Sequence, residues 1–222
     1  LIKNVYKHYG LMLSEFLRQK SMNINSEIYT IDKETEKILQ NKENYIIMTA
    51  HIGNWEMFIP IMSKYKNMMA VVRIQSNRGG DKFVKYLRTF NNISLIPNKN
   101  ATRKMLKGLK NDESLLLASD QNAKKKGKYI DFFNKPASIP IGAAYFHYKI
   151  KTKILIGFCT LNKSLKYNFR LKEINLEKNN EQLENIIIEL NSTYSKLLED
   201  EIKKTPEQYF WFHKKWDKEV YK

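Results

Sequence analysis

A histidine and a glutamate frame the segment His51-Ile-Gly-Asn-Trp-Glu56, which directly follows an apolar run at 45–50. An imidazole held by a nearby carboxylate is oriented and made more basic, which suits it to removing a proton from a hydroxyl. We therefore interpret His51 as a candidate general base and Glu56 as the group that holds its imidazole. The alternative is an ordinary strand-end histidine bonded to backbone, with Glu56 in solvent.

The elements around this segment favour the chemical interpretation. The run 45–50 has the length and composition of a buried strand, and the residues after Gly53 read as the start of a helix. Ligands of α/β proteins gather outside the carboxyl ends of strands, so His51 stands where a reacting group is useful. Gly53 allows a tight turn, and a carboxylate in the first helical turn suits the helix dipole.

Apolar spacing along the whole chain predicts an alternation of helices and strands. We expect helices at 1–20, 32–40, 55–66, 81–90, 101–109, 140–150, 179–203 and 207–216, and strands at 45–50, 69–73, 93–96, 114–119, 129–133, 153–161 and 167–174. The run 114–119 is apolar enough for a sheet buried on both faces. This rhythm predicts a single layered α/β domain over 1–222, with a mostly parallel or mixed sheet flanked by helices.

Composition limits the classes of protein to which the chain can belong. The formal net charge is +16, hydrophobic residues make up 42%, and the mean hydropathy is −0.55. Such a surplus favours an anionic partner without choosing among nucleic acid, lipid and acidic protein. No apolar run approaches the length of a membrane span. The single cysteine, Cys159, excludes an intrachain disulfide and is expected to lie in the core. We expect no metal and no cofactor, because neither ligand spacing nor a nucleotide-binding motif is present.

Several blocks extend the segment into a longer pattern. They are His51-Ile-Gly-Asn-Trp-Glu56, Val71-Val-Arg73, Tyr86-Leu-Arg88, Ser119-Asp-Gln121, Asp131-Phe-Phe-Asn-Lys-Pro-Ala137 and Pro206-Glu-Gln-Tyr-Phe-Trp-Phe-His-Lys-Lys-Trp216. In this order they resemble the lipid A biosynthesis lauroyl/myristoyl acyltransferase family, a branch of the glycerolipid acyltransferases with the HX4E motif. The resemblance covers about residues 5–218. It implies a glycerol-3-phosphate acyltransferase-like fold.

The resemblance also implies a reaction and its participants. A fatty acyl chain would pass from acyl carrier protein to a hydroxyl or hydroxyacyl group of a lipid A precursor, an anionic glycolipid, in lipopolysaccharide biosynthesis. The place implied is the cytoplasmic face of the inner membrane, with an N-terminal anchor missing before residue 1. The catalytic residues implied are His51 and Glu56. The substrate-binding candidates are Arg88, Asp120, Arg73, Gln121 and Asn54.

The match has departures. Ile74 replaces a proline, Asn134 replaces a glycine, and Lys214-Lys215 stands for paired arginines. These changes bear on acceptor recognition rather than on His51 and Glu56. The basic loop at 124–128 is either a solvated face or a contact for a headgroup or carrier protein. The tail aromatics Trp211, Phe212 and Trp216 are either core or an interfacial patch.

Three other functions stay open at this point. The same chemistry could act on another glycolipid or lipid hydroxyl. A pseudoenzyme could bind lipid without turnover, although both His51 and Glu56 are present. A basic nucleic-acid-binding domain would explain the charge, but no signature of such a domain is found, and we expect no nucleic-acid partner.

Overall fold

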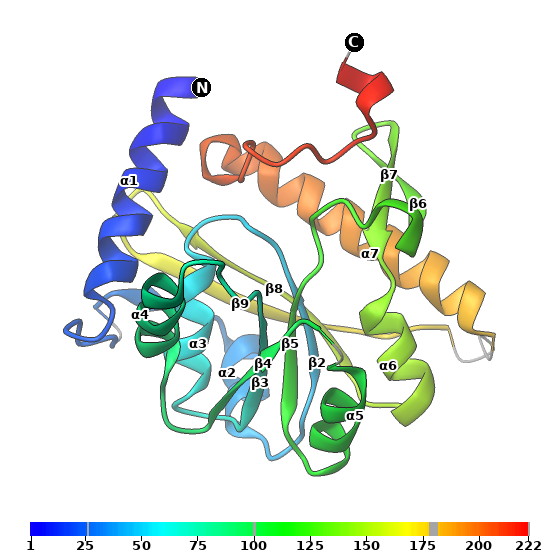
Figure 1. Ribbon diagram of the computed structural model, residues 1–222, viewed down its shortest axis with the longest axis horizontal. Coiled ribbons are helices and arrows are strands. Elements are labelled where there is room, and N and C mark those ends of the chain that lie inside the picture. Colours follow the sequence, from blue (N-terminus) through cyan, green and yellow to red (C-terminus); the bar gives the residue numbers. More distant parts are fainter. Residues whose placement is uncertain (26, 100, 178–181, 222) are drawn as a thin grey trace.

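The computed structural model describes residues 1–25, 27–99, 101–177 and 182–221. A twisted central sheet has helices on both faces (Figure 1). The predicted α/β class with a mostly parallel sheet is confirmed.

The sheet is parallel except for one antiparallel pair, β8 with β9. In spatial order its strands are β1 (Tyr29–Thr30), β9 (Tyr167–Ile174), β8 (Ile154–Leu161), β2 (Ile46–Thr49), β5 (Ser114–Ala118), β3 (Met68–Val72) and β4 (Ile93–Pro97). The strands predicted at 153–161 and 167–174 are β8 and β9, which form this antiparallel pair, whereas the two-residue strand β1 was not predicted. Strand β2 lies between β8 and β5, so both of its edges are paired with a neighbouring strand.

Helices divide between the two faces of the sheet, and each face has its own core. The helices are α1 (Ile2–Arg18), α2 (Lys33–Gln40), α3 (Phe58–Met62), α4 (Arg78–Arg88), α5 (Thr102–Lys110), α6 (Gly142–Ile150) and α7 (Leu183–Lys204). Four 3-10 turns are η1 (Trp55–Met57), η2 (Lys124–Lys126), η3 (Pro206–Gln208) and η4 (Lys218–Tyr221). Side chains of α5, α6 and α7 pack on one face, and those of α2 and α3 pack on the other. No described helix is long and apolar enough to cross a bilayer.

Strand β2 shows how the sequence builds both cores. Ile46 and Met48 point into the core under α6 and α7, while Ile47 points into the core under α2 and α3. Because side chains alternate along a strand, only a wholly apolar segment can serve two cores. All three side chains are fully buried.

The helix expected at 55–66 is shorter than predicted. Residues 55–57 form the 3-10 turn η1, and α3 ends at Met62. Pro60 has no N–H to donate to the Glu56 carbonyl, which removes one α-helical bond from the first turn. The N–H groups of Met57 and Phe58 instead bond three residues back, to Asn54 and Trp55.

Two further predictions for helices need correction. Pro140 ends strand β7 (Lys135–Pro140), which pairs with β6 (Gly127–Phe132) in a hairpin, and α6 begins only at Gly142. The segment after α7, residues 205–217, which we call the tail, forms the 3-10 turn η3 and then irregular backbone, not the helix predicted at 207–216. Its backbone bonds to the loop after β2, which competes with helix formation: the Phe210 N–H donates to the His51 carbonyl. The predicted start of α7 at 179 lies outside the described residues.

Candidate active site

His51 and Asp120 meet because two neighbouring strands end side by side. Strands β2 and β5 run parallel with Thr49 opposite Ala118, so the residues two positions further on face one another. The His51 Nδ1 lies 2.8 Å from Asp120 Oδ1. A carboxylate only accepts hydrogen bonds, so Nδ1 carries the proton and Nε2 is left as the basic nitrogen.

Burial and charge act in opposite directions on this pair. Burial by itself would lower the pKa of His51, but the hydrogen bond and charge of Asp120 outweigh it, and the pKa lies above the ordinary histidine value. Burial would raise the pKa of Asp120, yet His51 and Lys215 hold it below its usual range. The pair therefore keeps an ionised carboxylate behind an imidazole of enhanced basicity.

Glu56 does not hold the imidazole as predicted. Its carboxylate accepts two hydrogen bonds from Arg88, at 2.8 Å from Nε and 2.5 Å from Nη2, and a third from the Trp55 indole at 3.1 Å. The Glu56 side chain in η1 points toward Arg88 of α4, and Asp120 is the carboxylate that contacts His51. Glu56 still contributes charge that raises the pKa of His51, after the larger effects of burial and Asp120.

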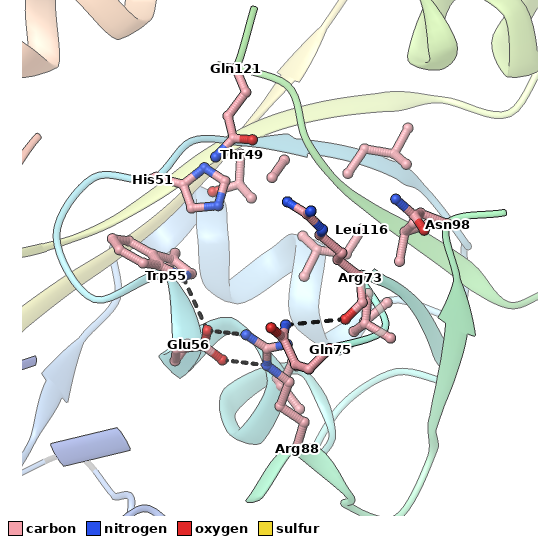
Figure 2. A pocket seen from close by; sticks show the side chains of 16 residues that line it. Thr49, His51, Trp55, Glu56, Arg73, Gln75, Arg88, Asn98, Leu116 and Gln121 are labelled. Carbon is pink, nitrogen blue, oxygen red and sulfur yellow. Dashed lines mark hydrogen bonds and ion pairs between the residues drawn. The ribbon is translucent and has the colours of Figure 1, made fainter. Parts of the chain in front are cut away.

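A cavity of about 570 Å³ opens beside these groups, between the strand ends of β3 and β5 (Figure 2). Its polar lining comprises Thr49, His51, Glu56, Arg73, Gln75, Arg88, Asn98 and Gln121. Its other walls are Trp55, Ile59, Ala70, Val71, Val72, Leu116, Leu117 and Ala118. Strand β5 was expected to be buried on both faces; instead its second half borders this cavity, and Ala118 is exposed.

The substrate-binding candidates divide into three groups. Arg73 and Gln121 line the cavity, and in the part of the chain that the structure describes the Arg73 guanidinium has no hydrogen bond or ion pair (Figure 2). Arg88 also lines the cavity, but its fork is occupied by Glu56. Asp120 and Asn54 are buried and do not line the cavity; they hold other groups in place.

The loop formed by residues 51–54, which we call the site loop, is fixed by close backbone contacts. Gly53 has a φ of 62°, and a Cβ there would lie 2.0 Å from the Cys159 carbonyl oxygen. The Asn54 N–H donates to the same carbonyl. Cys159 is fully buried, as predicted for a core residue. The fit explains why glycine stands at this position.

Helix α1 also holds the site loop. His8 Nε2 lies 3.1 Å from the Gly53 carbonyl oxygen, and Glu15 accepts hydrogen bonds from Asn54 Nδ2 and the Tyr167 hydroxyl, at 2.8 and 2.5 Å. The sequence predicted a helix at 1–20 but gave no indication that its polar residues reach the site.

Aromatic rings shield the imidazole. The rings of Trp55 and Phe210 lie 4.9 and 6.0 Å from that of His51, centroid to centroid. Of the tail aromatics left open above, Trp216 packs on Phe132, whereas Trp211 and Phe212 are 38% and 50% exposed.

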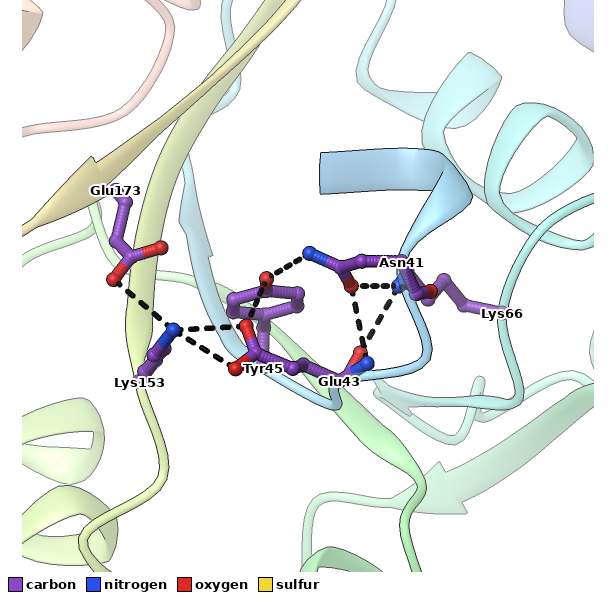
Figure 3. A network of polar contacts seen from close by, with 6 residues as sticks. All are labelled: Asn41, Glu43, Tyr45, Lys66, Lys153 and Glu173. Atoms are coloured by element: carbon purple, nitrogen blue, oxygen red, sulfur yellow. Dashed lines mark hydrogen bonds and ion pairs between the residues drawn. The ribbon is translucent and has the colours of Figure 1, made fainter. Parts of the chain in front are cut away.

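A second polar cluster lies at the amino ends of the strands, opposite the cavity (Figure 3). Lys66 Nζ donates to the carbonyl groups of Asn41 and Glu43, and Lys153 Nζ lies 2.9 Å from the Glu43 carboxylate. These contacts provide hydrogen-bond donors for the Asn41 and Glu43 carbonyl groups before β2, and they link the segments that lead into β2, β3 and β8. They stabilise the sheet without forming a reactive arrangement.

Among the described residues, no group of three His, Cys, Asp or Glu side chains is placed to hold a metal ion. The His51–Asp120 pair stands beside a cavity whose lining includes apolar side chains and the guanidinium groups of Arg73 and Arg88. Such an arrangement can activate a hydroxyl and bind an anion.

The sequence and structure were compared with known proteins. The profile of the family described as "Bacterial lipid A biosynthesis acyltransferase" matches residues 1–218. Comparison with curated proteins gives no significant match. Among solved structures, the 1-acyl-sn-glycerophosphate acyltransferase PlsC from Thermotoga maritima is similar at 12% identity and a TM-score of 0.48, over 92% of this chain and 97% of that one. Since the profile spans nearly the whole sequence, the chain belongs to the bacterial lipid A biosynthesis acyltransferases.

Proposed function

We propose that the protein transfers a fatty acyl chain from acyl carrier protein to a hydroxyl of a lipid A precursor, with His51 as the general base. The observation that carries the proposal is the His51–Asp120 pair, which lies at the edge of a cavity lined by apolar side chains and by the Arg73 guanidinium. Membership of the family indicates that the reaction is acyl transfer. The geometry of the site supports the choice of His51 as the base.

In the proposed reaction His51 Nε2 takes the proton of the acceptor hydroxyl as its oxygen forms a bond to the thioester carbonyl carbon. Asp120 stabilises the imidazolium that results. The carbon–sulfur bond then breaks, and the proton passes from His51 to the departing thiolate. This scheme contains no covalent acyl-enzyme. Cys159 is unsuited to be a nucleophile, because it is buried and burial raises the pKa of its thiol.

The two kinds of cavity wall suit the two parts of such substrates. Leu116, Leu117 and Val71 offer an apolar surface for an acyl chain. Arg73 offers an unpaired planar fork to a phosphate of the acceptor, and Gln121 can add a hydrogen bond. Arg88 acts indirectly in this scheme by neutralising Glu56 beside the site.

Surface features support an acidic donor and a membrane surface. The exposed lysines of η2 come four residues after Asp120, where an acidic carrier protein would approach. Helix α1 exposes Ile2, Tyr6, Leu13 and Leu17 in one stripe, and the Tyr6 ring contacts that of the exposed Phe212. Helices α1 and α4 together carry seven basic and two acidic residues, which suits anionic lipid at the inner face of the membrane.

The proposal is tested with purified protein, acyl carrier protein bearing a labelled acyl chain, and a lipid A precursor in mixed micelles. We expect labelled product, and we expect His51→Ala to lower kcat by about 10²–10⁴-fold. The matched control is His147→Asn, which changes the histidine of α6 bonded to the Thr152 carbonyl and keeps a donor there.

Two parallel reactions separate the parts of the proposal. Replacing the lipid A precursor by a lysophospholipid tests the acceptor, and preferential acylation of the lysophospholipid would overturn the lipid A assignment. Replacing the carrier-protein thioester by a coenzyme A thioester tests the donor in the same way. Transfer by His51→Ala at the wild-type rate would remove His51 as the base.

A further inference from the structure

A buried lysine stands behind the His51–Asp120 pair. Lys215 is only 2% exposed, and its Nζ donates a hydrogen bond of 2.5 Å to the Asp120 backbone carbonyl. The ammonium also lies 5.3 Å from the centre of the Phe132 ring. Burying an ammonium costs free energy unless it is paired, so a lysine held here calls for an explanation beyond packing.

The neighbours of Lys215 indicate what it does. Asp120 is the acidic group facing it, and the charge of Lys215 helps to keep the pKa of the Asp120 carboxyl low. His213 lies on the same tail, and Tyr194 and Tyr209 approach Asp120 from α7 and the tail. Burial raises the pKa of both tyrosines and lowers that of His213, so these three groups stay neutral near pH 7.

Among the described residues, the Lys215 ammonium is the one group that bonds to the main chain of Asp120. It follows the last residues of β5, where the ladder to β2 ends with the Ser119 N–H bonded to the Thr49 carbonyl. The carboxylate must nevertheless stay within hydrogen-bond distance of His51 Nδ1. Lys215 supplies a fixed donor to the Asp120 carbonyl on the side away from β2.

We propose that Lys215 is a positioning residue that locks Asp120 against His51, so that the tail completes the catalytic pair. The inference rests on the proposed use of His51 as the base. It adds a function for the tail, which reaches the site through a buried cation as well as through Phe210.

The chain offers a matched control for the test. Lys214 is the adjacent residue, carries the same charge and is exposed. Lys215→Met and Lys214→Met therefore remove the same charge from neighbouring positions, one behind Asp120 and one in solvent. Lys215→Arg keeps the charge and the donor.

We expect Lys215→Met to lower kcat about 10- to 100-fold with KM changed less than about twofold, because misplacing a supporting group affects the reaction step more than binding. Lys215→Arg should restore kcat to within about fivefold. Lys214→Met should match the wild type. Wild-type kcat for Lys215→Met would overturn the proposal.

A second readout needs no substrate and distinguishes positioning from bulk charge. NMR titration of His51 reports its pKa in each variant. Loss of a nearby positive charge alone would raise that pKa, whereas displacement of Asp120 removes the group that raises it, and the pKa falls. We expect a fall in Lys215→Met, and a rise or no change would overturn the proposal.

These two readouts also separate the proposal from the proposed function. If the wild type transferred no acyl group to any acceptor, the proposed function would fail while the His51 titration still tested Lys215. If Lys215→Met failed to fold, as shown by thermal unfolding, Lys215→Arg would provide the test.

Burial lowers the pKa of Lys215 to about 8. We therefore expect the wild-type kcat to fall above about pH 8 as Lys215 loses its charge, and we expect this fall to move to higher pH in Lys215→Arg, because a guanidinium stays protonated. An unmoved profile would count against the proposal.

Discussion

At the scale of single residues, the chemistry depends on which carboxylate faces the imidazole. Asp120 lies 2.8 Å from His51, while Glu56 is bound by Arg88 and Trp55. The two carboxylates are both near His51, but only one can set its tautomer. Substitutions of the two acids should therefore have different signatures.

Asp120→Asn should lower the plateau of kcat/KM by about 100-fold or more and move its acidic limb to lower pH. The His51 base works only when neutral. Asp120 raises the pKa of His51 against the effect of burial, so its loss lets that pKa fall. A profile of kcat/KM between pH 5 and pH 9 measures both effects. A larger shift of the limb in Glu56→Gln than in Asp120→Asn would contradict the pairing.

Gly53 permits a similarly sharp prediction. Gly53→Ala should lower the free energy of unfolding by about 2 kcal/mol or more, because its positive φ is strained for alanine and the new Cβ meets the Cys159 carbonyl. Gly10→Ala is the matched control. Its Cβ meets nothing within 4 Å, and helix propensity should raise stability by about 0.5–1 kcal/mol. Urea unfolding of both variants checks the prediction, and equal effects would refute it.

At the scale of elements, α1 is part of the site as well as an amphipathic surface helix. Glu15→Ala should leave Asn54 Nδ2 and the Tyr167 hydroxyl without their acceptor and cost about 1–3 kcal/mol, with a fall in kcat as the site loop loosens. Ser14→Ala is the control on the same helix, since among the described residues the Ser14 hydroxyl bonds only to the local Gly10 carbonyl. Thermal unfolding and initial rates measure the two consequences; a Glu15→Ala protein with the stability of Ser14→Ala would show that α1 does not support the loop.

The elements that could be predicted from the sequence are those fixed by local pattern. The apolar run before His51 and the helix expected at 32–40, where the Asp32 side chain accepts from the Thr35 N–H, both depend on neighbours in the chain. The tail and α3 depend on distant partners. No local pattern shows that the tail bonds to the site loop instead of to itself.

The candidate site was predictable in the same measure. The positions of His51, Arg73 and Asp120 follow from strands that end at one edge of a parallel sheet. The pairing of His51 with Asp120 follows only from the register of β2 against β5, which depends on the packing of the whole sheet. Lys215 carries no sequence signal of burial, because a lysine within a basic stretch is ordinarily solvated.

At the scale of the whole molecule, basic charge and exposed apolar side chains coincide on one side. Both acidic residues of α1 and α4 are engaged, Glu15 with Asn54 and Asp81 with Lys85. Two of the seven basic residues of these helices are paired, Lys85 with Asp81 and Arg88 with Glu56, and among the described residues the other five have no ion pair. The anionic bilayer that we propose as the site of action would provide both a counter-charge and an apolar contact for this side.

Leu13→Glu should weaken binding to vesicles containing anionic phospholipid about tenfold or more, because burying a leucine contributes about 1.5–3 kcal/mol and the new charge is repelled. Leu165→Glu is the control: Leu165 is 77% exposed in the turn between β8 and β9. Co-sedimentation at two salt concentrations measures the binding. Equal loss in both variants, or wild-type binding by Leu13→Glu, would place the membrane contact elsewhere.

The long-range contacts that hold the site loop affect the stage of synthesis at which the enzyme can become active. The loop bonds to Cys159, Gln208 and Phe210, all more than 100 positions further along the chain. Contacts of such separation form late, after the entropy of closing large loops has been overcome. The ribosome synthesises His51 early and the tail much later. The nascent chain therefore carries His51, which we propose as the base, before the contacts that hold the site loop can form. We expect activity only after the tail has been synthesised.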